Sequence, residues 1–201
     1  RGNHIITSSI EHHSVLDTCR FLTQNGFRVT YLPVDQHGLI DPGDVAEAIG
    51  GDTVLVSSMH ANDEIGTIEP IAKIGEIARS RKVPFHTDAV QTFGHIPVNV
   101  DELNVDALSS SAHKLYGPKG VGIIYVRKGI RMAPILHGGG QEGRLRAGTE
   151  NVPGIVGFAR AVDLAEREMR QESHKIMRLR DQLVQRLFAS VENVKLNGHP
   201  A

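Results

Sequence analysis

The sequence predicts an α/β fold in which a mainly parallel β-sheet is wrapped by helices. Short apolar runs alternate with amphipathic stretches along most of the chain, as expected for strand–helix alternation. The apolar runs are continuous, which is typical of strands buried on both faces of a parallel sheet. Hydrophobic residues make up 40% of the 201 residues, and 21 glycines raise the apolar share to an ordinary globular value.

Each expected element follows from a local pattern. Apolar runs bounded by turn residues predict strands over residues 4–9, 28–34, 53–59, 83–87, 105–111 and 121–126. Helical spacing of apolar residues predicts helices over residues 13–25, 41–49, 70–81 and about 152–190. Gly26 ends the first helix, whereas Asp41 caps the second and Pro42 takes its first position.

The overall composition excludes several classes of protein. The net charge of −1 gives no indication of a nucleic-acid partner. Cys19 is the single cysteine, which rules out an intrachain disulfide framework and fits a reducing, cytoplasmic setting. Because no run of about 18 apolar residues occurs, we expect no transmembrane helix and no membrane partner. No metal-binding spacing such as H-E-x-x-H is present, so we expect no metal site.

Polar clusters follow four of the predicted strands. Ligands of parallel sheets bind outside the carboxyl ends of the strands, so these clusters are expected to meet at one edge. The clusters cover residues 11–13, 60–64, 88–91 and 111–114.

Asp88 and Lys114 suggest a site for pyridoxal 5′-phosphate (PLP). PLP requires a lysine amine for covalent attachment and a carboxylate opposite its pyridine nitrogen, and two strand ends can supply both groups. The alternative stays open that Asp88 caps a helix and Lys114 is a surface lysine.

The neighbouring residues fit the same interpretation, but each of them alone is weak evidence for it. Ser111 and His113 offer hydroxyl and imidazole donors for a phosphate, although a serine-rich strand end is also common in plain turns. His12 could lie on an aromatic ring or transfer protons, or could simply be an exposed histidine at a helix start. The remaining histidines are expected at the surface or in local hydrogen bonds: His4, His37, His95, His137, His174 and His199.

A glycine-rich tract precedes the last helix. Three consecutive glycines at 138–140 allow a close backbone approach, and Arg144, Arg146 and Thr149 could bind an anion. A flexible surface loop is the alternative interpretation.

Taken together, five blocks resemble the cysteine desulfurases, PLP enzymes of the fold-type I, class V aminotransferase group. Their order and spacing match from about residue 4 to about residue 170. The blocks are EHHSVLDTC, MHANDEIGTIEPI, FHTDAVQTFGHIPV, SSSAHKLYGPKGVGIIYV and GGGQEGRLRAGTENVPGIVG.

The resemblance implies a role for each matching position. His12 would stack on the pyridine ring and help to move protons, Asp88 would pair with the ring nitrogen, and Gln91 would bind the phenolic oxygen. Ser111 and His113 would hold the phosphate, and Lys114 would carry the cofactor. Thr149, supported by Arg146, would reach the phosphate of a neighbouring subunit in a homodimer.

Three departures from the family pattern matter. Asp63, expected among the cofactor-binding residues, stands where a second asparagine is usual, and its negative charge near the phenolic oxygen should weaken the site or raise a pKa there. The family's phosphate loop is expected before residue 1, and its nucleophilic cysteine and substrate-binding arginine after residue 201. We therefore expect an incomplete large domain over residues 1–165, then the connecting helix and the beginning of a small domain over residues 166–201.

The function implied is that of a cysteine desulfurase. The substrate would be L-cysteine, and the sulfur would pass through an enzyme persulfide to an acceptor or scaffold protein for iron–sulfur cluster assembly or thiolation. The location would be the cytoplasm, or an organellar matrix in a eukaryote. A selenocysteine lyase, another class V lyase or aminotransferase, and a folded remnant without catalysis remain alternatives.

Overall fold

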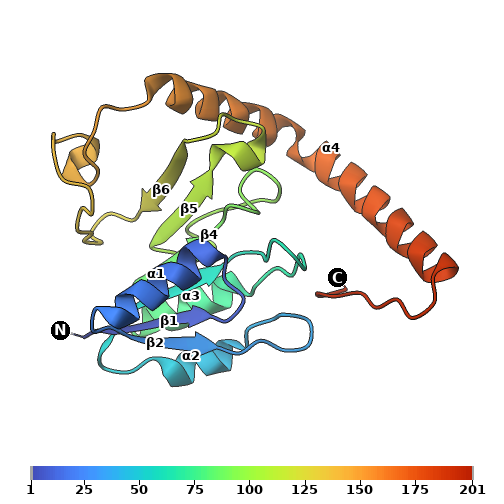
Figure 1. Cartoon of the computed structure of the whole chain (residues 1–201), viewed down its shortest axis with the longest axis horizontal. Helices are drawn as coiled ribbons and strands as arrows, with labels where there is room; N and C mark the ends of the chain where they lie inside the picture. Colours follow the sequence, from blue (N-terminus) through green and yellow to red (C-terminus); the bar gives the residue numbers. More distant parts are fainter. Residues whose placement is uncertain (1, 201) are drawn as a thin grey trace.

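A computed structural model describes residues 2–200 and contains one six-stranded sheet with the order β2-β1-β3-β4-β5-β6 (Figure 1). Strands β1 to β5 run parallel, and β6 pairs antiparallel with β5. The strands are β1 (His4–Ser8), β2 (Arg28–Leu32), β3 (Thr53–Met59), β4 (Phe85–Asp88), β5 (Ala107–Ser111) and β6 (Gly122–Val126). The prediction of a mainly parallel α/β sheet is therefore confirmed.

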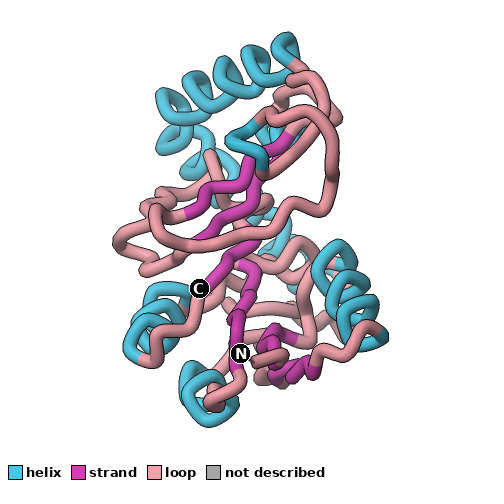
Figure 2. The backbone as a smooth tube through the Cα atoms, turned by 90° about the vertical axis from the view of Figure 1, so that its left-hand side faces the viewer, coloured by secondary structure: helices cyan, strands magenta, loops and turns pink. Residues whose placement is uncertain are grey.

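Helices lie on both sides of the sheet, as the view along it shows (Figure 2). The helices are α1 (His13–Gln24), α2 (Pro42–Ala48), α3 (Ile71–Ser80) and α4 (Val152–Ser190), with short 3₁₀ turns η1 (Ala112–Leu115) and η2 (Glu142–Arg144). All four predicted helices are present, and Asp41 accepts a hydrogen bond from Gly43 N as the predicted N-cap of α2.

The main core fills the space between one face of the sheet and helices α2 and α3. Ile6, Val56 and Phe85 from neighbouring strands contact Val45 of α2 and Ile74 of α3, and all are essentially inaccessible to solvent. Because β-strand side chains alternate between faces, the opposite face carries Ser57, His86, Asp88 and Ser109. This alternation places polar groups along the face that leads to the carboxyl edge.

Helix α4 contacts the rest of the fold mainly near its beginning. Phe158 and Ala161 pack against Ala112 and Leu115 of η1, and the helix then extends away from the sheet (Figure 1). The chain after α4 returns to the loop between β3 and α3, where His199 N donates to Thr67 Oγ1. The predicted domain boundary at 165/166 falls inside this continuous helix. None of the helices in the described residues is long and apolar enough to cross a membrane.

Candidate cofactor-binding site

Four strands bring the predicted polar clusters to one edge of the sheet. β1, β3, β4 and β5 are consecutive parallel neighbours, so their carboxyl ends lie side by side. Met59 pairs with Asp88, and Asp88 in turn pairs with Ser109. His60 N continues this contact by donating to Asp88 O over 2.8 Å. The predicted convergence of the four clusters is therefore present.

Asp88 is the last residue of β4 and is half-buried. Its Oδ1 accepts a hydrogen bond of 2.9 Å from Val90 N, which fixes the carboxylate at the start of the following turn. Among the ion pairs found within residues 2–200, none involves Asp88. A half-buried carboxylate without a cationic partner is suited to receive one.

His86 lies on the same face of β4 as Asp88. Its Nδ1 lies 2.9 Å from Ser57 Oγ, and its Nε2 lies 2.8 Å from Ser109 Oγ, so the imidazole joins three strands. Burial lowers the pKa of the His86 imidazole, although the nearby charge of Asp88 acts in the opposite direction. A neutral ring can donate through one nitrogen and accept through the other, which suits a bridge between two hydroxyl groups.

Glu11 connects the ends of β1 and β3. Its Oε1 accepts hydrogen bonds from Ser8 Oγ at 2.6 Å and Met59 N at 2.8 Å, and its buried Oε2 has no hydrogen-bond partner within the described chain. Burial raises the pKa of Glu11 to about 7, although these two hydrogen bonds act in the opposite direction. The carboxyl group therefore retains its proton over much of the acidic range.

His12 follows Glu11 and caps helix α1. Its Nδ1 accepts a hydrogen bond from Ser14 N and lies 2.9 Å from Ser14 Oγ. A nitrogen that accepts from a backbone N–H carries no proton, so the proton of the neutral ring is on Nε2. The exposed ring can thus hold or move a proton at Nε2.

Ser111, His113 and Lys114 lie together at the end of β5 and in η1. The Oγ atom of Ser111 is 2.7 Å from His113 Nδ1, which pairs the two predicted phosphate ligands. The side chain of Lys114 is exposed beside them, and its carbonyl accepts from His95 Nε2. Gln91, in the turn after β4, is half-buried.

Asn62 and Asp63 behave differently although they are adjacent. Asn62 is buried: its Nδ2 donates to Ile10 O, and its Oδ1 accepts from the backbone N–H groups of Glu64 and Ile65. Asp63 is exposed, and it lines a cavity of about 270 Å³ together with His12. The structure therefore places the unusual carboxylate near the predicted stacking histidine.

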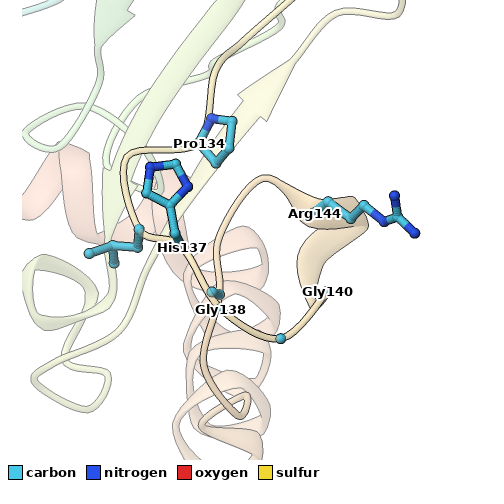
Figure 3. Close-up of a pocket in the computed structure, with 8 residues that line it drawn as sticks. Pro134, His137, Gly138, Gly140 and Arg144 are labelled. Atoms are coloured by element: carbon cyan, nitrogen blue, oxygen red, sulfur yellow. The ribbon is translucent and has the colours of Figure 1, made fainter.

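The glycine-rich loop lies away from these residues. It is drawn in gold at the left of Figure 1, at the end of the sheet where β6 ends. A cavity of about 360 Å³ within the loop is lined by His137, Gly138 and Arg144 among others (Figure 3). Arg146 and Thr149 are exposed, and no hydrogen bond or ion pair joins them to Lys114 within the described chain.

The expectation of a surface position or a local hydrogen bond is wrong for His4. His4 is completely buried between Thr53 Oγ1 and Thr30 Oγ1, 2.8 Å from each. His37 and His95 are partly exposed, as expected; His37 lies beside its neighbour Gln36, but each also contacts a distant carbonyl, Gly198 O and Lys114 O respectively. Such contacts depend on which segments the fold brings together, and local sequence carries no signal for them.

The chain matches a family model over its whole length. The model is that of aminotransferase class V, and it covers residues 1–201. The chain belongs to this family.

Two similar proteins within the family are named cysteine desulfurases. The chain is 56% identical over 198 residues to cysteine desulfurase IscS of Dictyoglomus turgidum, covering 98% of this chain and 50% of the relative. It is 48% identical to a cysteine desulfurase of Mus musculus, covering 100% of this chain and 44% of that protein. The chain thus spans about half the length of these relatives.

Solved structures agree with the fold. A NifS-like protein superimposes with a TM-score of 0.91 at 46% identity, covering 94% of this chain and 52% of that one. A structure described as SspA in complex with cysteine gives a TM-score of 0.79 at 50% identity, covering 81% of this chain and 47% of that one.

Proposed function

We propose that this chain forms the PLP-binding part of a cysteine desulfurase. The observation that carries the proposal is the placement of Asp88, His12 and the Ser111–Lys114 segment at the ends of neighbouring parallel strands. The donor set fits the cofactor: the Asp88 carboxylate makes no ion pair within residues 2–200, and Ser111 with His113 forms a hydroxyl–imidazole pair suited to phosphate. The names of the relatives and the cysteine complex of SspA support the substrate class.

Each residue then has a defined task. Asp88 would hold the ring nitrogen, Gln91 the phenolic oxygen, and Lys114 would attach the cofactor and take the α-proton of the substrate. His12 would lie on the ring and deliver a proton through Nε2. The bound cofactor would supply an electron-accepting ring. Thr149, with Arg146, would serve the site of a second subunit in a homodimer, which agrees with the lack of any hydrogen bond or ion pair between these residues and Lys114 within residues 2–200.

The reaction requires a thiol that Cys19 does not provide. L-cysteine and an enzyme thiol would give L-alanine and an enzyme persulfide, so sulfur moves from one thiol to another and no external oxidant is needed. Cys19 is 4% exposed, and burial raises the pKa of its thiol, which disfavours the nucleophilic thiolate. We propose that the accepting thiol lies outside these 201 residues, and that a cytoplasmic or organellar acceptor protein receives the sulfur.

Borohydride reduction in the presence of PLP tests the proposal. Peptide mass spectrometry should find a pyridoxyl adduct concentrated on Lys114, and Lys114→Ala should abolish it. Lys119, exposed five residues later, serves as the internal control for unspecific labelling. Equal labelling of Lys114 and Lys119 would contradict the proposed cofactor site.

A further inference from the structure

The backbone carbonyl of Lys114 lies at the carboxyl end of the short helix η1, where carbonyl groups have no hydrogen-bond partner within the helix itself. Lys114 lies in the last turn of η1, and Tyr116 ends that turn in the left-handed conformation with φ 61°. The backbone N–H groups of both Tyr116 and Gly117 return to Ala112 O and leave the carbonyl of Lys114 free. A carbonyl at the end of a helix requires a donor from elsewhere.

His95 supplies this donor. Its Nε2 lies 2.9 Å from Lys114 O, and because a carbonyl only accepts, Nε2 must carry the proton. The approach is close because Gly94 lies at φ 81°, and a Cβ atom there would be 2.3 Å from Leu115 Cδ2. The turn that ends at His95 therefore fits tightly against η1.

The same turn begins at Asp88. Val90 N donates to Asp88 Oδ1, Phe93 N donates to Ala89 O, and His95 N donates to Thr92 O. Residues 88–95 therefore form one hydrogen-bonded unit, with the predicted ring-binding carboxylate at one end and the donor to Lys114 at the other.

Helix α4 holds this unit from outside. Ser173 Oγ donates to His95 O over 2.6 Å, although the two residues are 78 positions apart. His95 and Glu172 also line the same cavity of about 300 Å³ between η1 and α4. Ser173 of α4 is thus connected to the backbone of Lys114 through His95.

We infer that His95 is a positioning residue for Lys114, and that Ser173 makes this position depend on helix α4. This inference rests on the proposed function, since it concerns the amine that would attach PLP. His95 touches neither cofactor nor substrate in this scheme. It orients the η1 backbone so that the Lys114 side chain projects toward the edge that carries Asp88.

Three variants separate positioning from general stability. Glutamine places its side-chain nitrogen near the position of imidazole Nε2, so His95→Gln should keep the hydrogen bond to Lys114 O. Asparagine is shorter, so His95→Asn should lose it. Ser173→Ala removes only the hydrogen bond to α4.

The readout is the ratio of pyridoxyl adduct on Lys114 to that on Lys119, measured at a series of borohydride quench times. The ratio compares two lysines within one molecule, so it does not depend on protein yield. We expect His95→Asn to lower it about two- to tenfold, which corresponds to the loss of one hydrogen bond. His95→Gln should stay within about twofold of the wild type, and Ser173→Ala should fall between the two variants.

Each outcome has a defined meaning. A wild-type chain without preference for Lys114 would overturn the proposed function and this inference with it. A wild-type preference that His95→Asn leaves unchanged, or that both His95 variants lower equally, would overturn only the positioning role. An unchanged ratio in Ser173→Ala would overturn the connection to α4.

Discussion

Residues 2–126 and residues 127–200 bury their side chains very differently. The first region encloses the sheet core, where Ile6 and Phe85 are inaccessible to solvent. Within residues 127–200, only Gly154, Phe158, Ala161 and Gly198 are buried. The difference shows that the candidate site is supported by the sheet, whereas most of α4 and the glycine-rich loop add little burial.

Two phenylalanine truncations test this difference with the largest expected effect. Phe85→Ala removes a fully buried ring from β4 and should lower the free energy of unfolding by about 3–5 kcal/mol. Phe188→Ala removes a ring that is 51% exposed on α4 and should cost less than about 1 kcal/mol. Denaturant unfolding measures both, and similar losses would contradict the assignment of stability to the sheet.

The pH dependence of stability provides a second test within the first region. Glu69 is 3% exposed, and burial raises its pKa from 4.5 to about 7 although its carboxylate accepts from Ile40 N. The folded chain therefore binds the proton more tightly than the unfolded chain does, and stability falls as pH rises from about 4.5 to 7.

Glutamine does not titrate, so Glu69→Gln should abolish the contribution of this residue to the pH dependence of stability. Relative to the variant, the free energy of unfolding of the wild type should decrease by at most about 3 kcal/mol between about pH 4.5 and 7. Unfolding curves at several pH values measure the slope, and Asp63→Asn, at an exposed position, is the control that should keep it. An unchanged slope in Glu69→Gln would contradict the raised pKa.

Substitutions of helix N-caps are expected to have the smallest effect on stability. They compare α2 of the first region with α4 of the second. Asp41 caps α2 against the core, so Asp41→Ala should lower global stability by about 1 kcal/mol. Asn151 Oδ1 caps α4 by accepting from Gly154 N, and Asn151→Ala should mainly speed amide exchange at the start of α4. An equal loss of global stability in both variants would show that α4 unfolds together with the sheet.

Periodicity was sufficient to predict the fold because each strand and helix carries its own pattern. The apolar run of residues 53–59 became β3 with the same limits, and Pro42 began α2 as expected. The antiparallel direction of β6 and the 3₁₀ turn η1 were not predicted, since direction and short turns depend on neighbouring segments rather than on apolar spacing.

The site could be predicted as a set of strand ends but not as a set of contacts. Asp88 and Lys114 stood out because their side chains follow apolar runs. His95 and Ser173 did not, because their importance comes from contacts with residues 19 and 78 positions away. Glu11 was visible as part of a polar cluster, yet its hydrogen bond to Met59 N requires the pairing of β1 with β3.

Amide hydrogen exchange with and without PLP tests most directly whether the four strand ends form one binding site. We predict slower exchange in the segments 10–13, 60–64, 88–95 and 111–116 when PLP is added, with no change over residues 175–190 of α4. Lys114→Ala should reduce this protection, because the covalent attachment is lost. Protection confined to the glycine-rich loop, or absent from these four segments, would contradict the site proposed at the carboxyl edge of the sheet.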